Sequence, residues 1–506
     1  MSKSLSKRDV LKTLGWATVG ASISARAAAA ERTRPWDIVV VGGGNAGLPL
    51  AIFASRRGAR VLVIEAAGQV GGTLFLSTGQ MSAAGTKFQK ELGIEDSPQL
   101  FYEDVMRISN GTADPDVLRL AVFNSADTAD WLFQHGFKPR AGQPVLGSGH
   151  DPYSQRRYFW GEEGGISILK VLEEQLKPEI DKGNVTILTQ TSVTELIQDA
   201  RTKAIKGVVA QTADGTSHRY LAGAVALTTG GYCSNKEMFE QIEGVKNFGD
   251  TTYPYSQGVG IKLALSAGGY LRNKQCHQPL FNAILAVDDV PSPLLTRIAS
   301  DASVRVPWEI FVNADGQRFI REDNATYDQR EKALARQPLE RCWVVFDSAI
   351  RDASPPLIRA WSKEQFVEAF ERYPLFYKSE TLEGLARAAG IGASGLAATV
   401  GQYNAGQAAG RDVLGRTHMP LPIARPPYYA VRIQGYFLLG AAGIAVNKTL
   451  QVVDQDGRAI PNLFAAGEML GFGAFQGQSY CGGMSVTPAL TFGRLLGERL
   501  IPLKKA

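Results

Sequence analysis

Cysteine is scarce in this sequence: the 506 residues include four, Cys233, Cys276, Cys342 and Cys481, and they stand far apart. There is no C-x-x-C-H motif and no pair of C-x-x-C motifs, which argues against covalently attached c-type haem and against a structural zinc site. We therefore predict no metal centre. Spacing alone does not tell whether any of these cysteines form disulfides.

An excess of charge of one sign is also lacking. The formal net charge is +5, and residues 1–30 supply +4 of it, because five basic side chains there stand against one acidic side chain (5 − 1 = 4). The rest of the chain is close to neutral, so no basic face remains for a nucleic-acid partner. We predict that the protein binds no nucleic acid.

The sequence has no long hydrophobic run. Thr13–Ala25 is too short and too rich in small residues to span a bilayer as a stable helix. The basic stretch SKSLSKRDVLK precedes it and an A-x-A-like cleavage site follows, so residues 1–30 are predicted to be an export signal peptide. SKRDVLK resembles a twin-arginine signal with Lys7 in place of the first arginine, which implies export of the folded protein to the periplasm.

Glycine, in contrast, is abundant at 54 residues, and its first cluster follows a predicted buried strand. Asp37–Val41 is a short β-branched run typical of a parallel strand. Gly42, Gly44 and Gly47 then form G-x-G-x-x-G. These glycines allow a tight turn, a close approach of the backbone to a pyrophosphate, and packing of a helix on the strand.

A helix and a second strand complete this unit. Leu48–Arg57 is predicted to be a helix whose N-terminus favours phosphate charge, and Ala59–Ile64 a strand. Glu65 ends that strand, where a carboxylate can accept hydrogen bonds from ribose hydroxyl groups. Together these features predict a dinucleotide site.

Further glycine-rich segments lie far away in the sequence. They are 71–85, 228–231 after a predicted strand, and 482–483 before a predicted helix, and Glu468 ends another predicted strand. An ordinary loop is the alternative for the first of them. NAD alone would not need so many backbone segments close to it. We therefore predict one long ligand, FAD, that runs through the whole domain.

The pattern of elements changes at about residue 258, and 506 residues exceed one comfortable core. The predicted fold class is α/β: a discontinuous Rossmann-like FAD-binding domain, residues 31–257 and 427–506, with an inserted α+β capping or substrate domain, 258–426, that includes a helical segment near 363–404. Residues 140–163, rich in aromatic residues and turn formers, are predicted either to border a substrate or partner surface or to form a solvated loop.

From about residue 36 to 500 the sequence resembles the flavoprotein family of soluble fumarate reductases and 3-ketosteroid Δ1-dehydrogenases. The resemblance rests on VVVGGGNAG, a GG pair followed by MSAAGT, TTGG, GVGIKLALSAGG, NADGQRFIRE, LFAAGE, and a closing GG followed by TFGRLLGE. It implies that a hydride moves between the flavin and a substrate carbon while a protein group moves a proton at the neighbouring carbon.

The resemblance also implies that FAD is held without a covalent bond. Membrane-bound members attach the flavin through a histidine just after the first glycine pair, and residues 71–81 contain no histidine. The implied FAD contacts are Gly42, Gly44, Asn45, Ala46, Gly47, Glu65, Ala66, Gly72, Thr73, Ser77, Thr78, Gly79, Val193, Thr229, Gly230, Glu468, Ser485 and Val486.

Four candidate catalytic residues follow from the same resemblance. Arg351 is placed like the arginine acid of fumarate reductases and Glu322 like its relay carboxylate, which is needed because arginine hardly deprotonates. Tyr327 stands near the family's relay arginine, where ketosteroid-type members use a tyrosine in proton abstraction. His277 is placed like a histidine on the substrate carboxylate. The alternatives are structural: an ion pair, a buried ring or a core histidine.

Two substitutions bear on the substrate. Tyr480 stands where fumarate reductases carry a carboxylate-binding arginine; a phenol cannot form that bidentate clamp, but it can bind a carbonyl as in the ketosteroid enzymes. The run 436–443, YFLLGAAG, lacks the second histidine of the carboxylate site. Burial of unpaired carboxylates costs roughly several kcal/mol per charge. A neutral, apolar ketone or ring substrate is therefore predicted.

We thus predict an FAD-dependent dehydrogenase acting on a carbon–carbon bond next to a carbonyl of a small molecule. One alternative is the reverse reaction, in which a periplasmic reductase of the fumarate or urocanate kind reduces an activated alkene with electrons from a separate cytochrome or quinone. A flavin-binding protein without catalytic activity is the other alternative.

Overall fold

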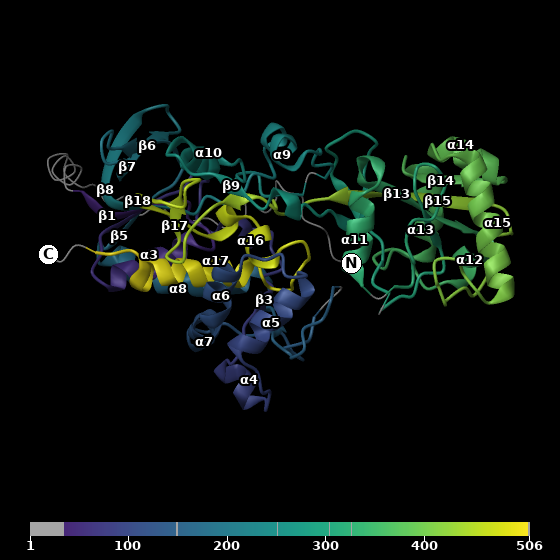
Figure 1. Ribbon diagram of the computed structural model, residues 1–506, viewed down its shortest axis with the longest axis horizontal. Coiled ribbons are helices and arrows are strands. Elements are labelled where there is room, and N and C mark those ends of the chain that lie inside the picture. The colour runs from purple at the N-terminus through teal and green to yellow at the C-terminus, as the bar shows by residue number, and fades with distance from the viewer. Residues whose placement is uncertain (1–34, 148–149, 250, 303, 325, 504–506) are drawn as a thin grey trace. The chain divides into compact units, whose positions relative to one another are not determined.

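The first predicted strand lies inside an eight-stranded sheet in the computed structural model of this protein (Figure 1). Five strands run parallel in the order β18-β8-β1-β2-β5, and β17 lies antiparallel to β18 at one edge. Strands β6 and β7 join β8 as an antiparallel ribbon. The bounds are β1 Trp36–Val41, β2 Val61–Ile64, β5 Val185–Leu188, β6 Thr191–Gln198, β7 Ile205–Thr212, β8 Ser217–Leu227, β17 Gln451–Val453 and β18 Ala459–Ala465.

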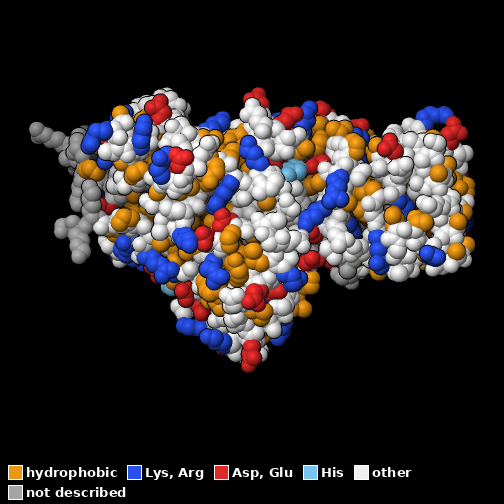
Figure 2. All heavy atoms as spheres, in the orientation of Figure 1, with side chains coloured by type: hydrophobic (Ala, Val, Ile, Leu, Met, Phe, Trp, Pro, Cys, Tyr) orange, Lys and Arg blue, Asp and Glu red, His pale blue; other side chains and the backbone are white. Residues whose placement is uncertain are grey.

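The structure describes residues 35–147, 150–249, 251–302, 304–324 and 326–503. The predicted signal peptide, 1–30, lies outside them. The chain from Trp36 onward forms one compact unit. Within the described ranges, no helix combines the length and the apolar character that crossing a membrane requires. On the face shown in Figure 2, basic and acidic side chains are interspersed.

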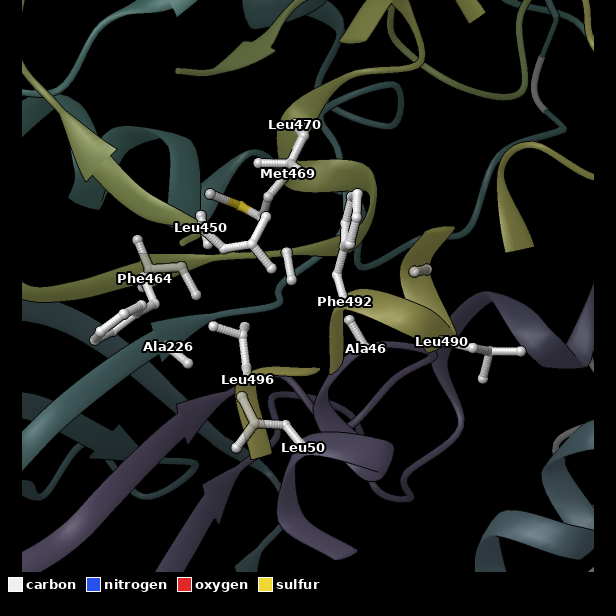
Figure 3. Packing of buried hydrophobic residues seen from close by; sticks show 14 of the residues in the cluster. Ala46, Leu50, Ala226, Leu450, Phe464, Met469, Leu470, Leu490, Phe492 and Leu496 are labelled. Atoms are coloured by element: carbon white, nitrogen blue, oxygen red, sulfur yellow. The ribbon is translucent and has the colours of Figure 1, made fainter. Parts of the chain in front are cut away.

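Helix α3 (Gly47–Arg56) packs against both α8 (Gly165–Asp181) and α17 (Val486–Leu495) beside this sheet (Figure 1). Strands β1 and β2 are built from apolar residues because a parallel sheet covered on both faces has no exposed side. Figure 3 shows the resulting core, in which Leu50 of α3 and Phe464 of β18 belong to the same buried cluster as Phe492 of α17.

Smaller elements complete this first core. Helices α5 and α6 begin at the N-caps Ser97 and Asp114, each followed by proline at the first helical position. The bounds are α4 Lys87–Glu91, α5 Pro98–Ile108, α6 Pro115–Phe123, α7 Ser125–Gln134, α9 Lys236–Glu243, α10 Val259–Ser266 and α16 Gly473–Gln476, with the short strand pairs β3 (Met81–Ser82) and β4 (Tyr158–Phe159), and β9 (Leu271–Arg272) and β16 (Gly443–Ile444).

A second, antiparallel sheet has its own hydrophobic core. Its order is β11-β10-β15-β13-β12, with β14 paired to β15. The strands are β10 Leu280–Leu285, β11 Leu294–Arg297, β12 Ile310–Val312, β13 Arg341–Asp347, β14 Phe376–Ser379 and β15 Tyr428–Tyr436; the helices are α11 Tyr327–Ala335, α12 Ser348–Ala353, α13 Lys363–Arg372, α14 Leu382–Ala389 and α15 Ala393–Ala409.

The predicted α/β fold class is confirmed, as are the strands and the helix of the glycine-rich unit. The predicted helical segment near 363–404 is interrupted by β14, which pairs with β15. Helix α10 packs in the first core although the prediction assigns it to the inserted domain, and β15 is central to the second sheet although it follows residue 427. The division into domains stays a prediction.

All four cysteines are buried, and none of them is in a disulfide with another. Cys233 and Cys481 belong to the first core and Cys342 to the second. Burial raises the pKa of each of these thiols above its ordinary value. The cysteines are therefore packing residues in this fold.

Candidate functional site

A cavity of about 460 Å³ lies at the carboxyl ends of four neighbouring parallel strands. The chain leaves β1 at Gly42, β2 at Glu65, β8 at Thr228 and β18 towards Gly467, and all four residues line the cavity. Ligands of open α/β sheets bind outside this edge. The cavity is therefore where this fold would hold a nucleotide.

The structure brings most of the predicted cofactor residues to this cavity. Its wall includes Gly42, Gly44, Asn45, Ala46, Glu65, Ala66, Gly72, Thr73, Ser77, Thr78, Val193, Thr229, Gly230, Glu468, Ser485 and Val486. Gly47 and Gly79 do not line it. A Cβ on Gly47 would lie 2.0 Å from the Gly42 carbonyl oxygen, and one on Gly79 would lie 2.5 Å from the Gly164 carbonyl carbon. These two glycines let neighbouring backbone segments pack closely.

Glycine residues, which have no side chain, form the cavity wall next to helix α3. Gly42 has a φ of +103°, and a Cβ there would lie 2.6 Å from the Thr228 carbonyl oxygen. A Cβ on Gly72 would lie 3.3 Å from the Cα of Gly44 on the opposite segment. Helix α3 has no acidic residue in its first turn and no side-chain cap. Its positive N-terminal end can therefore receive an anion such as a pyrophosphate.

Glu65 holds this turn in shape. Its carboxylate accepts hydrogen bonds from the Gly43 and Ala67 N–H groups, both at 2.8 Å. The side chain is buried, which raises its pKa above the ordinary value even though these backbone N–H groups lower it. A carboxylate has further lone pairs, so Glu65 can also accept from a ligand hydroxyl group, as the sequence predicts.

Three polar atoms in the cavity wall are buried without a partner among the described residues: Asn45 Oδ1, Thr251 Oγ1 and Glu468 Oε1. Burial raises the pKa of Glu468 to about 7. Each unpartnered polar atom costs roughly 1–3 kcal/mol. FAD fits these residues, since its hydroxyl and ring N–H groups can donate to them and its phosphates can accept from the α3 N-terminus.

A row of three aromatic rings stands at the other end of the site. The ring of His150 lies 4.3 Å from that of Tyr480 and 4.9 Å from that of Tyr327, measured between centroids. Tyr480 lines the cavity, and its hydroxyl donates to Gln80 Oε1 at 3.2 Å. Tyr327, the first residue of α11, lies one ring further from the cavity. Burial raises the pKa of both phenols.

Hydrogen bonds continue from Tyr327 into the second sheet. Asn282 Nδ2 donates to Tyr327 Oη at 3.1 Å, and Tyr436 Oη donates to Asn282 Oδ1 at 3.4 Å. The Tyr327 hydroxyl also bonds with that of Ser300. A polar network therefore surrounds this buried phenol.

The structure does not bring together Arg351 and Glu322, for which the sequence predicts a relay. Arg351 bonds with Asp352 and with the Tyr429 hydroxyl, on helix α12 away from α11 (Figure 1). Glu322 is fully buried and forms a bidentate pair with Arg318 at 2.7 and 2.6 Å. Neither lines the cavity. The geometry gives the relay no support, because each charge already has another partner.

His277 also differs from its predicted role. Both of its ring nitrogens are engaged, Nδ1 with Glu243 at 2.8 Å and Nε2 with Glu340 at 2.6 Å. Burial opposes its charge, but the two carboxylates outweigh burial and raise its pKa to about 9. His277 is absent from the cavity wall. In this structure it bridges two elements and leaves no ring nitrogen for a substrate.

Two residues at the site were missed by the sequence analysis. His150 belongs to the 140–163 segment, for which only a border to a substrate surface was predicted. Arg297, the last residue of β11, lines the cavity. Their positions depend on contacts with distant segments. No local motif marks either residue.

Comparisons with known proteins agree with this site. The sequence matches the FAD binding domain family over residues 37–486. A probable fumarate reductase, Ifc3, of Shewanella frigidimarina is 29% identical over 479 residues, which cover 94% of this chain and 76% of that protein. The solved open conformation of a flavocytochrome c3 fumarate reductase is similar with a TM-score of 0.69 and 28% identity, over 94% of this chain and 80% of that chain.

A solved 3-ketosteroid Δ1-dehydrogenase from Sterolibacterium denitrificans has the same fold, with a TM-score of 0.70 and 21% identity over 93% of this chain and 100% of that chain. The predicted resemblance to these flavoproteins and the predicted cofactor, FAD, are confirmed. The chain belongs to the FAD binding domain family and is an FAD-dependent oxidoreductase.

Proposed function

We propose that this enzyme dehydrogenates a carbon–carbon bond next to a carbonyl group of a small molecule, with Tyr480 binding the carbonyl oxygen. The observation that carries this proposal is the hydroxyl of Tyr480 in the cavity wall, backed by the rings of His150 and Tyr327. Bound FAD, held by the glycine-rich strand ends, would supply the hydride acceptor.

Tyr480 has the properties that carbonyl binding needs. Burial raises its pKa, so its hydroxyl keeps its proton at neutral pH and can donate it in a hydrogen bond. Its bond to Gln80 at 3.2 Å is long for a hydroxyl donor and can be exchanged for one to a substrate carbonyl. A hydrogen bond to the carbonyl withdraws electrons and makes the α-hydrogen more acidic.

Tyr327 is the proposed proton acceptor, with His150 as the carrier between it and the cavity. The Asn282 amide donates to the Tyr327 oxygen, which favours its phenolate form. His150 contacts both tyrosine rings, and its Nε2 lies 3.2 Å from Glu331 Oε1. For a proton to pass from the substrate to Tyr327, an imidazole nitrogen of His150 would have to accept it and the imidazole would then donate a proton to the Tyr327 phenolate. The ring contacts place the imidazole between the two phenols, and a bound substrate would have to complete the hydrogen bonds.

Part of the cavity wall is apolar. Leu438, Leu439, Phe472 and Phe475 line it. This supports a substrate with an apolar body over a small diacid. The reverse reaction, reduction of an activated alkene with electrons from a separate cytochrome or quinone, is the second candidate, favoured by the similarity to fumarate reductases. In either direction, the predicted signal at residues 1–30 would direct the enzyme to the periplasm.

Stopped-flow absorbance of the flavin separates the two directions. Oxidised enzyme is mixed with saturated ketones, and bleaching of the flavin band is expected. Chemically reduced enzyme is mixed in parallel with enones and enoates. Reoxidation by fumarate at a rate above that of every enone would contradict the proposal and support the second candidate.

A further inference from the structure

We propose that Arg297 binds one carboxylate of the substrate, so that the substrate is a carbonyl compound with an apolar body and a single acidic group. This inference rests on the proposed function for the site of reaction. It adds the charge of the molecule and the residue that recognises it.

Arg297 holds an unusual position in the cavity. Among the described residues that line it, Arg297 is the only one with a positive charge. The wall has two acidic residues: Glu65 accepts from backbone N–H groups, and Glu468 Oε1 has no partner. No ion pair joins Arg297 to a carboxylate in the described part of the chain, and its hydrogen-bond partner is Tyr436. Arg297 is an exposed residue that water can solvate, and as the one cation of the described wall it still attracts an anionic ligand to its edge of the cavity.

The side chain is held on one edge only. Arg297 Nε donates to Tyr436 Oη at 2.9 Å, and its guanidinium carbon lies 5.5 Å from the centre of the Tyr436 ring. Tyr436 is a buried residue of β15. No hydrogen bond occupies the two terminal nitrogen atoms of Arg297 within the described residues. A guanidinium oriented in this way presents a fork that matches a carboxylate.

The same hydrogen bonds connect this fork to the proposed site of reaction. Tyr436, which orients Arg297, also bonds to Asn282, and Asn282 bonds to Tyr327. The carboxylate position and the proton acceptor are therefore fixed by one network. A substrate held at one end by Arg297 would be oriented for reaction at its carbonyl end.

The number of acidic groups on the substrate follows from the number of cations in the cavity wall. One cation can pair with one carboxylate, and the rest of the described wall offers a second carboxylate only uncharged polar groups and apolar side chains such as Leu438, Leu439, Phe472 and Phe475. An unpaired charge in apolar surroundings is strongly disfavoured. The site therefore favours a monoacid over a diacid, and over the neutral substrate that the sequence predicts, which would leave Arg297 paired with water alone.

The test uses the FAD-loaded enzyme and three related probes: 3-oxocyclohexane-1-carboxylate, its methyl ester and cyclohexanone. Binding is followed through changes in the flavin absorption spectrum. The acid is expected to bind up to about fivefold more tightly than the ester, because the pair is bidentate but Arg297 is exposed to water. In Arg297→Gln this preference should disappear, whereas Arg297→Lys should keep part of it.

Two further variants control for indirect effects. Tyr436→Phe keeps the ring but removes the acceptor of Arg297 Nε, so the affinity for the acid should fall several-fold while that for the ester stays unchanged. Arg387→Gln alters an exposed arginine of α14 that pairs with Glu383, and should change nothing.

Equal affinity of the wild-type enzyme for acid and ester would overturn the inference. Loss of FAD from both Arg297 variants would overturn it too, because it would assign the arginine to the cofactor. Flavin bleaching by neutral ketones without any preference for acids would leave the proposed function standing and remove this inference. Binding of acids that depends on Arg297, without bleaching of the flavin by any ketone, would support this inference and contradict the proposed function.

Discussion

The hydroxyl of Tyr480 is a partly buried donor at the cavity wall, and it can be removed without disturbing the ring. In Tyr480→Phe the ring still packs on His150, so the fold and FAD content should be kept. The rate of flavin reduction by a saturated ketone should fall by about 10²–10³, the usual loss for one donor to a developing oxyanion.

Tyr428→Phe is a matched control for this variant, because Tyr428 begins β15 of the second sheet and, among the described residues, its hydroxyl bonds to the nearby Ala424 carbonyl alone. It should reduce its flavin at the wild-type rate. A Tyr480→Phe enzyme that did so as well would remove Tyr480 from the proposed reaction.

Tyr327 should determine how the rate of flavin reduction depends on pH. Burial raises its pKa above the ordinary value for tyrosine, so at neutral pH most of it is protonated. A base must be deprotonated to accept a proton, so the rate of flavin reduction should rise with pH up to the alkaline end of the stable range. In Tyr327→Phe the rate should fall by about 10²–10⁴ and this rise should vanish.

The measurement is the single-turnover rate from about pH 6 to pH 10. Asn282→Ala, which removes a donor to the Tyr327 oxygen, should shift the rise to higher pH, since that hydrogen bond favours the phenolate. An unchanged profile in Tyr327→Phe would contradict the assigned role.

At this scale the sequence predicted residues that belong to local motifs and missed those placed by long-range contacts. The glycines, Glu65 and Tyr480 stand next to recognisable turns. Arg297 reaches the cavity only because β11 pairs with β10, and Arg351 points elsewhere because α12 follows the end of β13. A short motif match locates a residue in the sequence, but it does not tell where the fold places that residue's side chain.

Among the elements, the junction of β1 and α3 depends on the absence of a side chain at Gly47. A Cβ there would lie 2.0 Å from the Gly42 carbonyl oxygen, so the turn must open in Gly47→Ala. FAD affinity should fall tenfold or more, and the free energy of unfolding by about 1–3 kcal/mol, because backbone and helix both shift. Fluorescence titration with FAD and thermal unfolding would measure the two effects.

Gly401→Ala in α15 is the matched substitution. A Cβ at Gly401 would meet no atom within 4 Å, so alanine should be tolerated or should stabilise the helix by up to about 1 kcal/mol. Loss of FAD affinity in both variants to the same extent would refute the steric argument at Gly47.

Elements were predictable where neighbours in sequence are neighbours in space. The β1–α3–β2 unit is such a case, and its pattern of apolar residues and glycines is enough. Strand β14 was missed because four residues between helices become a strand only by pairing with β15, more than forty residues later. The same long-range pairing places β15 in the second sheet rather than the first.

Across the whole molecule, His277 connects the two cores. It bonds with Glu243 at the end of α9 and with Glu340 just before β13. Its pKa is raised to about 9, so it stabilises the fold fully below about pH 6.5, its ordinary range, and this stabilisation is lost as the pH rises through 9. The contribution is up to about 3 kcal/mol.

His277→Gln should therefore lower the melting temperature at pH 6 and make little difference at pH 10, because the wild-type histidine is then uncharged. Thermal unfolding of the FAD-loaded enzyme at several pH values would show this. A constant difference between the two proteins across the range would mean that charge is not what His277 contributes.

The burial of all four cysteines makes the native surface inert towards thiol reagents. A single cysteine introduced on an exposed strand or helix would thus be the only one to react with a maleimide dye, and no native cysteine would need to be removed first. A fluorophore attached to α15 could then report on the second sheet during turnover, against the absorbance of the flavin itself.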